Sequence, residues 1–246
     1  MHIETDGLVI KEQNVGESDR LITVLTSEYG LIRAFVSGGK SMKNRNLAGT
    51  GLLTYSDFVF YKGRDAYNVN SAVEREVFFD LRTNIENLSI AFYLAELAGE
   101  LAPESSECGE LLKLLLNSIY LLSKEKLPAT QIKAVAELRA VAMSGYVPNL
   151  IACTECGAFE SEPMFFDIKH GTLACSVCAT PQYTQLSYST VTAMRHIIYS
   201  EAKKVFDFTL SDRCLAELSR ICERFALEQV GCNFKTLEFY KSVKTI

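Results

Sequence analysis

The chain has 246 residues, which is enough for one large domain or for two or three small ones. Hydrophobic residues make up 48% of it, so a sizeable core can form and wholesale disorder is excluded. With 25 basic and 30 acidic residues the net charge is −5, which argues against a nucleic-acid binder that is basic over its whole surface. Any basic surface that binds nucleic acid must therefore be confined to one part of the molecule.

Residues 1–80 have the pattern of short β-strands, rich in β-branched and aromatic side chains. Turn residues such as Gly16, Gly30, Gly39 and Gly63 separate them. The expected strands are 8–11, 21–25, 31–36, 58–61 and 67–70. Five short strands in this length suit a small Greek-key barrel of the OB type. A generic small barrel or a half-sandwich would give the same periodicity.

From residue 84 onward the periodicity is helical. One predicted helical face carries Ile85, Leu88, Phe92 and Ala95. Further helices are expected over 111–122 and 130–144, the latter ending near Gly145, and after the N-cap candidates Ser187 and Ser211. Four cysteines are expected in the core: Cys108, Cys214, Cys222 and Cys232. The predicted class is α+β, with a barrel (1–80), a helical domain in two parts (81–150 and 183–246) and a cysteine module (151–182) inserted in it.

The inserted module contains two Cys-x-x-Cys pairs, Cys153/Cys156 and Cys175/Cys178. Each pair can fold into a tight turn that directs both sulfurs at one cation, and four thiolates fill the tetrahedral shell that zinc prefers. Apolar residues on either side of Lys169-His170-Gly171 predict a β-hairpin that brings the second pair beside the first. The spacing therefore predicts one structural zinc ion per chain.

Other chemistry is possible for these cysteines. One pair alone could be a thioredoxin-like redox site, but no βαβ pattern surrounds either pair. A catalytic zinc is disfavoured because four protein ligands leave no open position for water. His170 could replace one thiol, although its place in the hairpin predicts an ordinary turn residue.

A local basic cluster lies in the predicted barrel. The segment from Arg33 to Arg64 has six basic residues against one acid, Asp57, and aromatic residues are interleaved with them. The basic residues are Arg33, Lys40, Lys43, Arg45, Lys62 and Arg64. Cations that contact phosphates and aromatic rings that stack on bases are how OB-folds hold single strands. A solvated loop beside ordinary core aromatics would give the same composition.

No catalytic signature emerges. The three histidines, His2, His170 and His196, are scattered, and no nucleophile-elbow, zinc-protease or dinucleotide-binding pattern occurs. This favours a binding protein over an enzyme. The charged N-terminus is unlike a signal peptide and the most apolar run, 111–122, is too short to span a bilayer, so we expect a cytoplasmic protein without membrane contact.

Three segments together resemble the bacterial recombination mediator family RecO: Gly7–Gly30, Val36–Lys40, and Ala136–Pro148 followed by Cys153–Gly157. The resemblance covers most of the chain. It implies an OB-fold N-terminal domain, a helical C-terminal domain and a zinc module. It also implies binding and annealing of single-stranded DNA and help, with RecR, in loading RecA onto DNA covered by single-strand-binding protein. No covalent chemistry and no small-molecule substrate are implied.

The resemblance further implies that the helical domain captures the acidic C-terminal tail of single-strand-binding protein. Such a tail, ending in an aromatic residue, needs an apolar pocket and a nearby cation. The helix over 130–144 carries Arg139 and Lys133 close to Val135 and Leu138, so these two cations are the predicted contacts. The alternative function is a zinc-stabilised protein-interaction scaffold that does not bind DNA directly.

Overall fold

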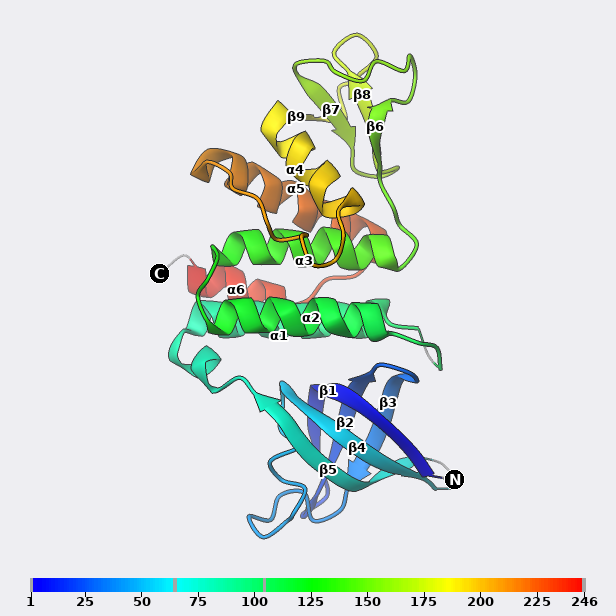
Figure 1. Ribbon diagram of the computed structural model, residues 1–246, viewed down its shortest axis with the longest axis vertical. Helices are drawn as coiled ribbons and strands as arrows, with labels where there is room; N and C mark the ends of the chain where they lie inside the picture. Colours follow the sequence, from blue (N-terminus) through cyan, green and yellow to red (C-terminus); the bar gives the residue numbers. More distant parts are fainter. Residues whose placement is uncertain (1, 64–65, 104, 245–246) are drawn as a thin grey trace. The chain divides into compact units, whose positions relative to one another are not determined.

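The computed structural model describes residues 2–63, 66–103 and 105–244 (Figure 1). Packing divides the chain into two compact units. Residues 1–124 and 234–246 form the first unit, which contains the barrel, and residues 125–233 form the second, which contains the cysteine pairs. The predicted α+β class is confirmed.

Five strands of the first unit close into a barrel in the order β1-β2-β3-β5-β4. They are β1 (His2–Val15), β2 (Asp19–Thr26), β3 (Gly30–Val36), β4 (Thr54–Lys62) and β5 (Tyr67–Val77). Neighbouring strands are antiparallel except β3 and β5, and β1 pairs with both β2 and β4. This confirms the predicted OB-type barrel.

The barrel core follows from the alternation of side chains along each strand. Val9, Ile22, Val24 and Phe60 point inward and are fully buried. The pairing of β1 with β2 shifts register between Val9 and Lys11. This bulge interrupts the alternation, because a regular strand that buries Val9 would also turn residue 11 inward, whereas Lys11 is exposed.

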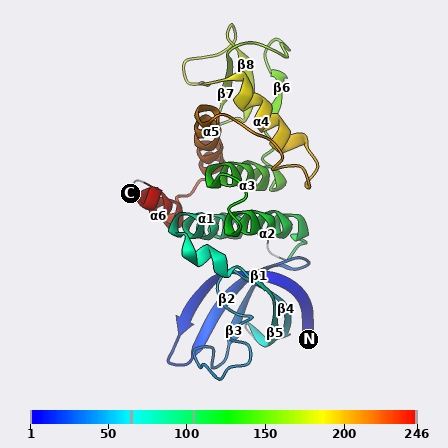
Figure 2. The ribbon, with the colours of Figure 1, turned by 60° about the vertical axis from the view of Figure 1, so that its left-hand side comes forward.

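The first unit continues with η1 (Phe79–Thr83), α1 (Ile85–Leu101) and α2 (Gly109–Ser123), and ends with α6 (Lys235–Lys244). α1 and α2 lie side by side (Figure 2). Tyr93 of α1 is fully buried, with its ring 5.5 Å from that of Phe234. The predicted face of this helix is only partly buried. Ala95 is enclosed, Phe92 is half-buried and Ile85 is 58% exposed.

The second unit contains α3 (Ala129–Met143), α4 (Tyr188–Tyr199) and α5 (Asp212–Val230), together with a small sheet. The sheet order is β6-β8-β7-β9, with β6 (Asn149–Cys153), β7 (Met164–Asp167), β8 (Thr172–Cys175) and β9 (Thr184–Leu186). β7 and β8 form the predicted hairpin. Ser187 and Ser211 cap α4 and α5 through their side-chain oxygens, as predicted. Gly145, the predicted glycine after α3, has a φ of +101°.

The packing of the helices separates them into two groups. α1, α2 and α6 belong with the barrel, whereas α3, α4 and α5 belong with the cysteine module. Whether the four predicted segments fold as separate domains stays a prediction. Of the four cysteines expected in the core, Cys108 and Cys222 are buried, but Cys214 and Cys232 are only half-buried. Among the described residues no helix is both long and apolar enough to cross a membrane.

The first prediction concerns Gly30, at the start of β3. Its φ of +63° is left-handed, and a Cβ there would overlap the carbonyl oxygen of Pro103. Gly16 also has a positive φ, of 55°, but a Cβ there would meet no atom within 4 Å. We expect Gly30→Ala to lower the free energy of unfolding by more than about 2 kcal/mol, and Gly16→Ala by only about 1 kcal/mol. Urea denaturation measures both, and equal losses would contradict the close packing at Gly30.

Candidate functional site

The four predicted metal ligands come together in the second unit. Cys153 ends β6 and Cys175 ends β8, and a tight turn after each strand carries the second cysteine of the pair. All four Sγ atoms lie within 4.8 Å of one another, and those of Cys156 and Cys175 are 3.7 Å apart. The cluster could therefore hold a metal ion.

Backbone N–H groups of the two turns favour thiolates in this cluster. Burial raises the pKa of the Cys153 thiol, but hydrogen bonds from the backbone of Cys175, Cys156 and Glu155 outweigh it and lower the pKa to about 6. Hydrogen bonds from the backbone N–H groups after Cys175 likewise lower its pKa. Hydrogen bonding between thiols, first with Cys175, raises the pKa of Cys178 to about 12. A cation would remove the remaining protons, since metals bind the thiolate form.

His170 lies outside the cysteine cluster. Its Nδ1 is 2.7 Å from Oδ2 of Asp167, whose other carboxylate oxygen accepts from the backbone N–H of Lys169. The imidazole therefore stabilises the turn between β7 and β8. This is the role that the hairpin pattern favoured over a place among the metal ligands.

The cysteine module is joined to the helices by Arg195 of α4, which the sequence did not single out. Its Nε donates to the carbonyl of Leu150 at 2.7 Å, and its Nη2 donates to the carbonyls of Ile151 and Phe159. The guanidinium also lies over the Phe159 ring, 4.6 Å from its centroid. One cation thus holds both ends of the segment that contains Cys153 and Cys156.

The segment between β3 and β4, here called the basic loop (residues 37–53), is anchored by a buried arginine. Arg20 is 9% exposed, forms an ion pair with Glu12 at 3.1 Å and donates to Oγ1 of Thr50 at 2.7 Å. That hydroxyl in turn donates to the carbonyl of Asn46. The Asn46 amide oxygen accepts from the backbone N–H of Ala72 in β5. The loop is therefore fixed to the barrel from its buried side.

The basic loop also carries Lys40, Lys43 and Arg45, all exposed. Lys40 donates its Nζ to the carbonyl of Gly16 at 2.8 Å, and Arg45 donates to the carbonyl of Asn70 at 3.2 Å. Both partners are neutral carbonyl groups, so neither hydrogen bond cancels the charge of the side chain that donates it. Three of the six predicted DNA contacts thus lie on one loop.

Two further predicted contacts, Lys62 and Arg33, lie outside the basic loop. Lys62 ends β4, with its Nζ 5.8 Å from the centroid of the Tyr67 ring. Arg33 is on the outer face of β3, in a pocket between the barrel and α1. Arg64 lies outside the described residues.

The two predicted partner contacts on α3 differ sharply. Lys133 is completely buried, with Nζ 2.7 Å from Glu137 and 2.8 Å from Glu223. Burial lowers its pKa, but the two carboxylates outweigh burial and raise it, so Lys133 stays charged. This corrects the prediction for Lys133, because no partner can reach it. Arg139 is half-buried, and its Nη1 donates to the carbonyls of Ile197 and Ile198 at the end of α4.

Comparisons with known proteins cover nearly all of the chain. The family model described as "Recombination protein O N terminal" matches residues 1–77, and "Recombination protein O C terminal" matches residues 82–238. The chain belongs to the RecO family. A relative named DNA repair protein RecO, from Acetivibrio thermocellus, is 35% identical. The alignment covers 100% of this chain and 98% of the relative. The protein of that name from Alkaliphilus metalliredigens is 29% identical, over 99% of this chain and 100% of the relative. The one from Caldicellulosiruptor saccharolyticus is 28% identical, over 98% of this chain and 99% of the relative.

The buried Lys133 cluster yields the second prediction. Lys133→Ala leaves Glu137 buried without this cation, which should lower the free energy of unfolding by about 3–5 kcal/mol. Lys113→Ala is the control, since it removes an exposed i,i+3 pair with Glu110 and should cost less than about 1 kcal/mol. Thermal unfolding of both variants measures the difference, and similar losses would show that the buried pair is not needed for stability.

Proposed function

We propose that this chain is a recombination mediator that binds and anneals single-stranded DNA. With RecR it helps to load RecA recombinase onto DNA covered by single-strand-binding protein. The observation that carries the proposal is family membership across both parts of the chain, at residues 1–77 and 82–238. The proposal involves no covalent chemistry, so the chain is not an enzyme. It places the protein in the cytoplasm, where cysteines stay reduced.

The basic loop is the proposed centre of the DNA surface. Lys40, Lys43 and Arg45 are all exposed on it, in a chain that is acidic overall. Phosphate contacts of this kind supply affinity without sequence specificity, as annealing of any complementary pair requires. Lys62 extends the set along the β4–β5 hairpin, with Tyr67 beside it as an aromatic contact for a base.

The proposed metal is one structural Zn²⁺ per chain. Zinc–thiolate bonds of about 2.3 Å put the sulfurs of a tetrahedral site about 3.8 Å apart. The Sγ atoms of Cys156 and Cys175 are 3.7 Å apart, and the whole cluster spans no more than 4.8 Å. Four protein ligands would saturate the ion, so it would hold the module together and would not bind a substrate.

The helical part of the chain is the proposed site for the C-terminal tail of single-strand-binding protein. Arg139 is the candidate cation. Since it also caps α4, a variant with alanine at this position would lose both the helix cap and the charge.

The third prediction tests the metal. We expect wild-type protein purified without chelator to contain one zinc per chain by atomic emission, and Cys153→Ser to lose it, because metal binding is coupled to folding. Cys232→Ser, outside the cluster, should keep its zinc. Wild-type protein that contains no zinc would disprove the assignment.

The fourth prediction tests the DNA surface. Lys40→Glu/Lys43→Glu should weaken binding to all single strands alike and reduce the dependence of log K on log salt by about 0.7 for each phosphate that the variant no longer neutralises. The control, Lys203→Glu/Arg213→Glu, makes the same charge change at two exposed residues of the second unit. Fluorescence anisotropy over a salt series and an annealing assay provide the measurements.

Two outcomes would count against the DNA proposal in different ways. If the loop variant anneals complementary strands at the wild-type rate, the DNA surface lies elsewhere on the molecule. If the wild-type chain binds no oligonucleotide at low salt, alone or with RecR, the alternative function follows. The chain would then be a zinc-stabilised scaffold that binds protein and not DNA.

A further inference from the structure

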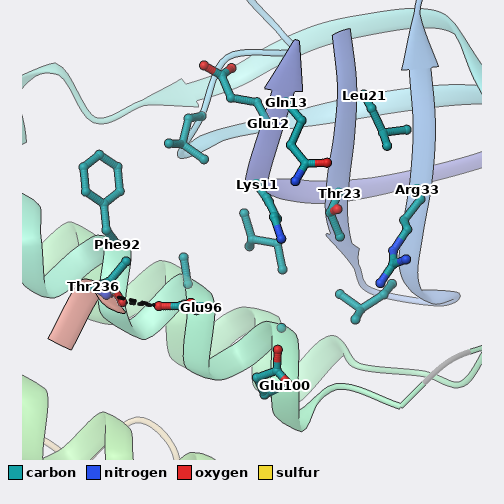
Figure 3. A pocket seen from close by; sticks show the side chains of 15 residues that line it. Lys11, Glu12, Gln13, Leu21, Thr23, Arg33, Phe92, Glu96, Glu100 and Thr236 are labelled. Atoms are coloured by element: carbon teal, nitrogen blue, oxygen red, sulfur yellow. Dashed lines mark hydrogen bonds between the residues drawn. The ribbon is translucent and has the colours of Figure 1, made fainter. Parts of the chain in front are cut away.

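A pocket of about 580 Å³ lies between the outer face of the barrel and α1, within the first unit (Figure 3). Strands β1, β2 and β3 form one wall, α1 forms the opposite wall, and Thr236 near the start of α6 lines one side. The basic loop contributes only Leu52 to the lining. The pocket is therefore separate from the exposed lysines of that loop.

Three polar side chains form a row across the strands of the barrel wall. Lys11 pairs with Thr23, and Thr23 pairs with Arg33. Adjacent strands are about 5 Å apart, so the two cations lie on either side of one hydroxyl. Figure 3 shows both long side chains extending from the strands toward α1. Such a row offers charge and a hydroxyl donor to a single anionic group.

The cations of this row are not neutralised by their own surroundings. Glu12 is engaged by Arg20 at 3.1 Å, and Glu96 accepts hydrogen bonds from the backbone N–H and the hydroxyl of Thr236. Among the described residues, neither Lys11 nor Arg33 has a side-chain hydrogen bond or ion pair. Two of the three carboxylates that line the pocket are held by other partners, and the third, Glu100, forms no ion pair with Lys11 or Arg33, so both cations are left to bind an anion from outside.

The lining also includes apolar side chains and a further carboxylate, Glu100. Phe92 rises from α1 toward the strands (Figure 3). Leu21 of β2 and Leu31 of β3 line the pocket on the barrel side. Gly99 allows α1 to approach β1 closely, since a Cβ there would lie 3.1 Å from Cδ1 of Ile10. Glu100 also lines the pocket and, among the described residues, has no side-chain partner, so it can accept hydrogen bonds from a ligand.

We propose that this pocket binds one nucleotide of a single strand. The phosphate contacts the row formed by Lys11, Thr23 and Arg33, the base packs against Phe92, and exocyclic amino groups of the base donate to Glu100. The inference rests on the DNA binding proposed above and adds a second, base-contacting site to it. An anion, a flat apolar body and amino donors within one ligand of this size describe a nucleotide.

The course of β2 connects this site to the basic loop. From Thr23 back to Ser18 is five residues, or about 17 Å of strand. The carbonyl of Ser18 accepts the backbone N–H of Lys40, and that of Gly16 accepts its Nζ. A bound strand that leaves the row along β2 therefore arrives at Lys40. This continuity favours a polyanionic strand over an acidic peptide as the occupant.

Two variants of the full-length chain test the proposal by anisotropy with a deoxycytidine oligonucleotide and an abasic oligonucleotide of equal length. Phe92→Leu keeps an apolar side chain but removes the ring, so it should weaken deoxycytidine binding roughly tenfold and leave abasic binding unchanged. Lys11→Gln/Arg33→Gln should weaken both and reduce the salt dependence of log K by about 0.7, for the one phosphate that the row contacts. Lys203→Gln/Arg213→Gln is the matched control.

The outcomes separate this inference from the DNA proposal. If Lys40→Glu/Lys43→Glu loses affinity while Phe92→Leu and Lys11→Gln/Arg33→Gln bind deoxycytidine like wild type, the pocket holds no nucleotide and the DNA surface stands alone. If an Asp/Glu-rich decapeptide binds wild type but not Lys11→Gln/Arg33→Gln, and DNA affinity is unchanged, the pocket belongs to a protein partner. If wild type binds no strand, both proposals fail together.

Discussion

The register shift in β1 is the constraint on which the outward surfaces of the first unit depend. A regular strand that buries Val9 would also bury Lys11, where an unpaired ammonium group would be costly. The shift places Ile10 and Lys11 together on the outside, so the same strand can close the core and line the pocket. It also fixes where the basic loop ends, because the carbonyl of Val9 accepts the N–H of Leu53.

The second unit depends on a different principle, in which cations hold separate elements together. Lys133 joins α3 to α5 through Glu223, and Arg195 joins α4 to the segment of the first cysteine pair. Gln229 of α5 donates to two carbonyls in the hairpin turn at Ile168 and Lys169. The cysteine module is therefore bonded to two helices, and a loss of order around the sulfurs would extend to α4 and α5.

The parts of this structure that could be predicted from the sequence are those set by local patterns. The barrel strands follow from alternation, and the cysteine cluster follows from the spacing of the two pairs. Partnerships between distant residues could not be predicted. Glu223 lies 90 residues beyond Lys133, so the sequence around Lys133 gave no sign that Lys133 is buried. Arg33 is close in sequence to the basic loop, but strand register places it beside Thr23 and Lys11. Helical periodicity likewise did not show which helices pack with the barrel.

The anchoring of the basic loop by Arg20, Thr50 and Asn46 has a kinetic consequence. Because these bonds already hold the loop in place, contact with an anion would cost the loop little backbone entropy. Association then needs no prior folding step, and its rate is set by diffusion and by the field of the exposed cations. Thr50 is buried, yet by keeping the loop in place it would influence the rate at which an anion binds there.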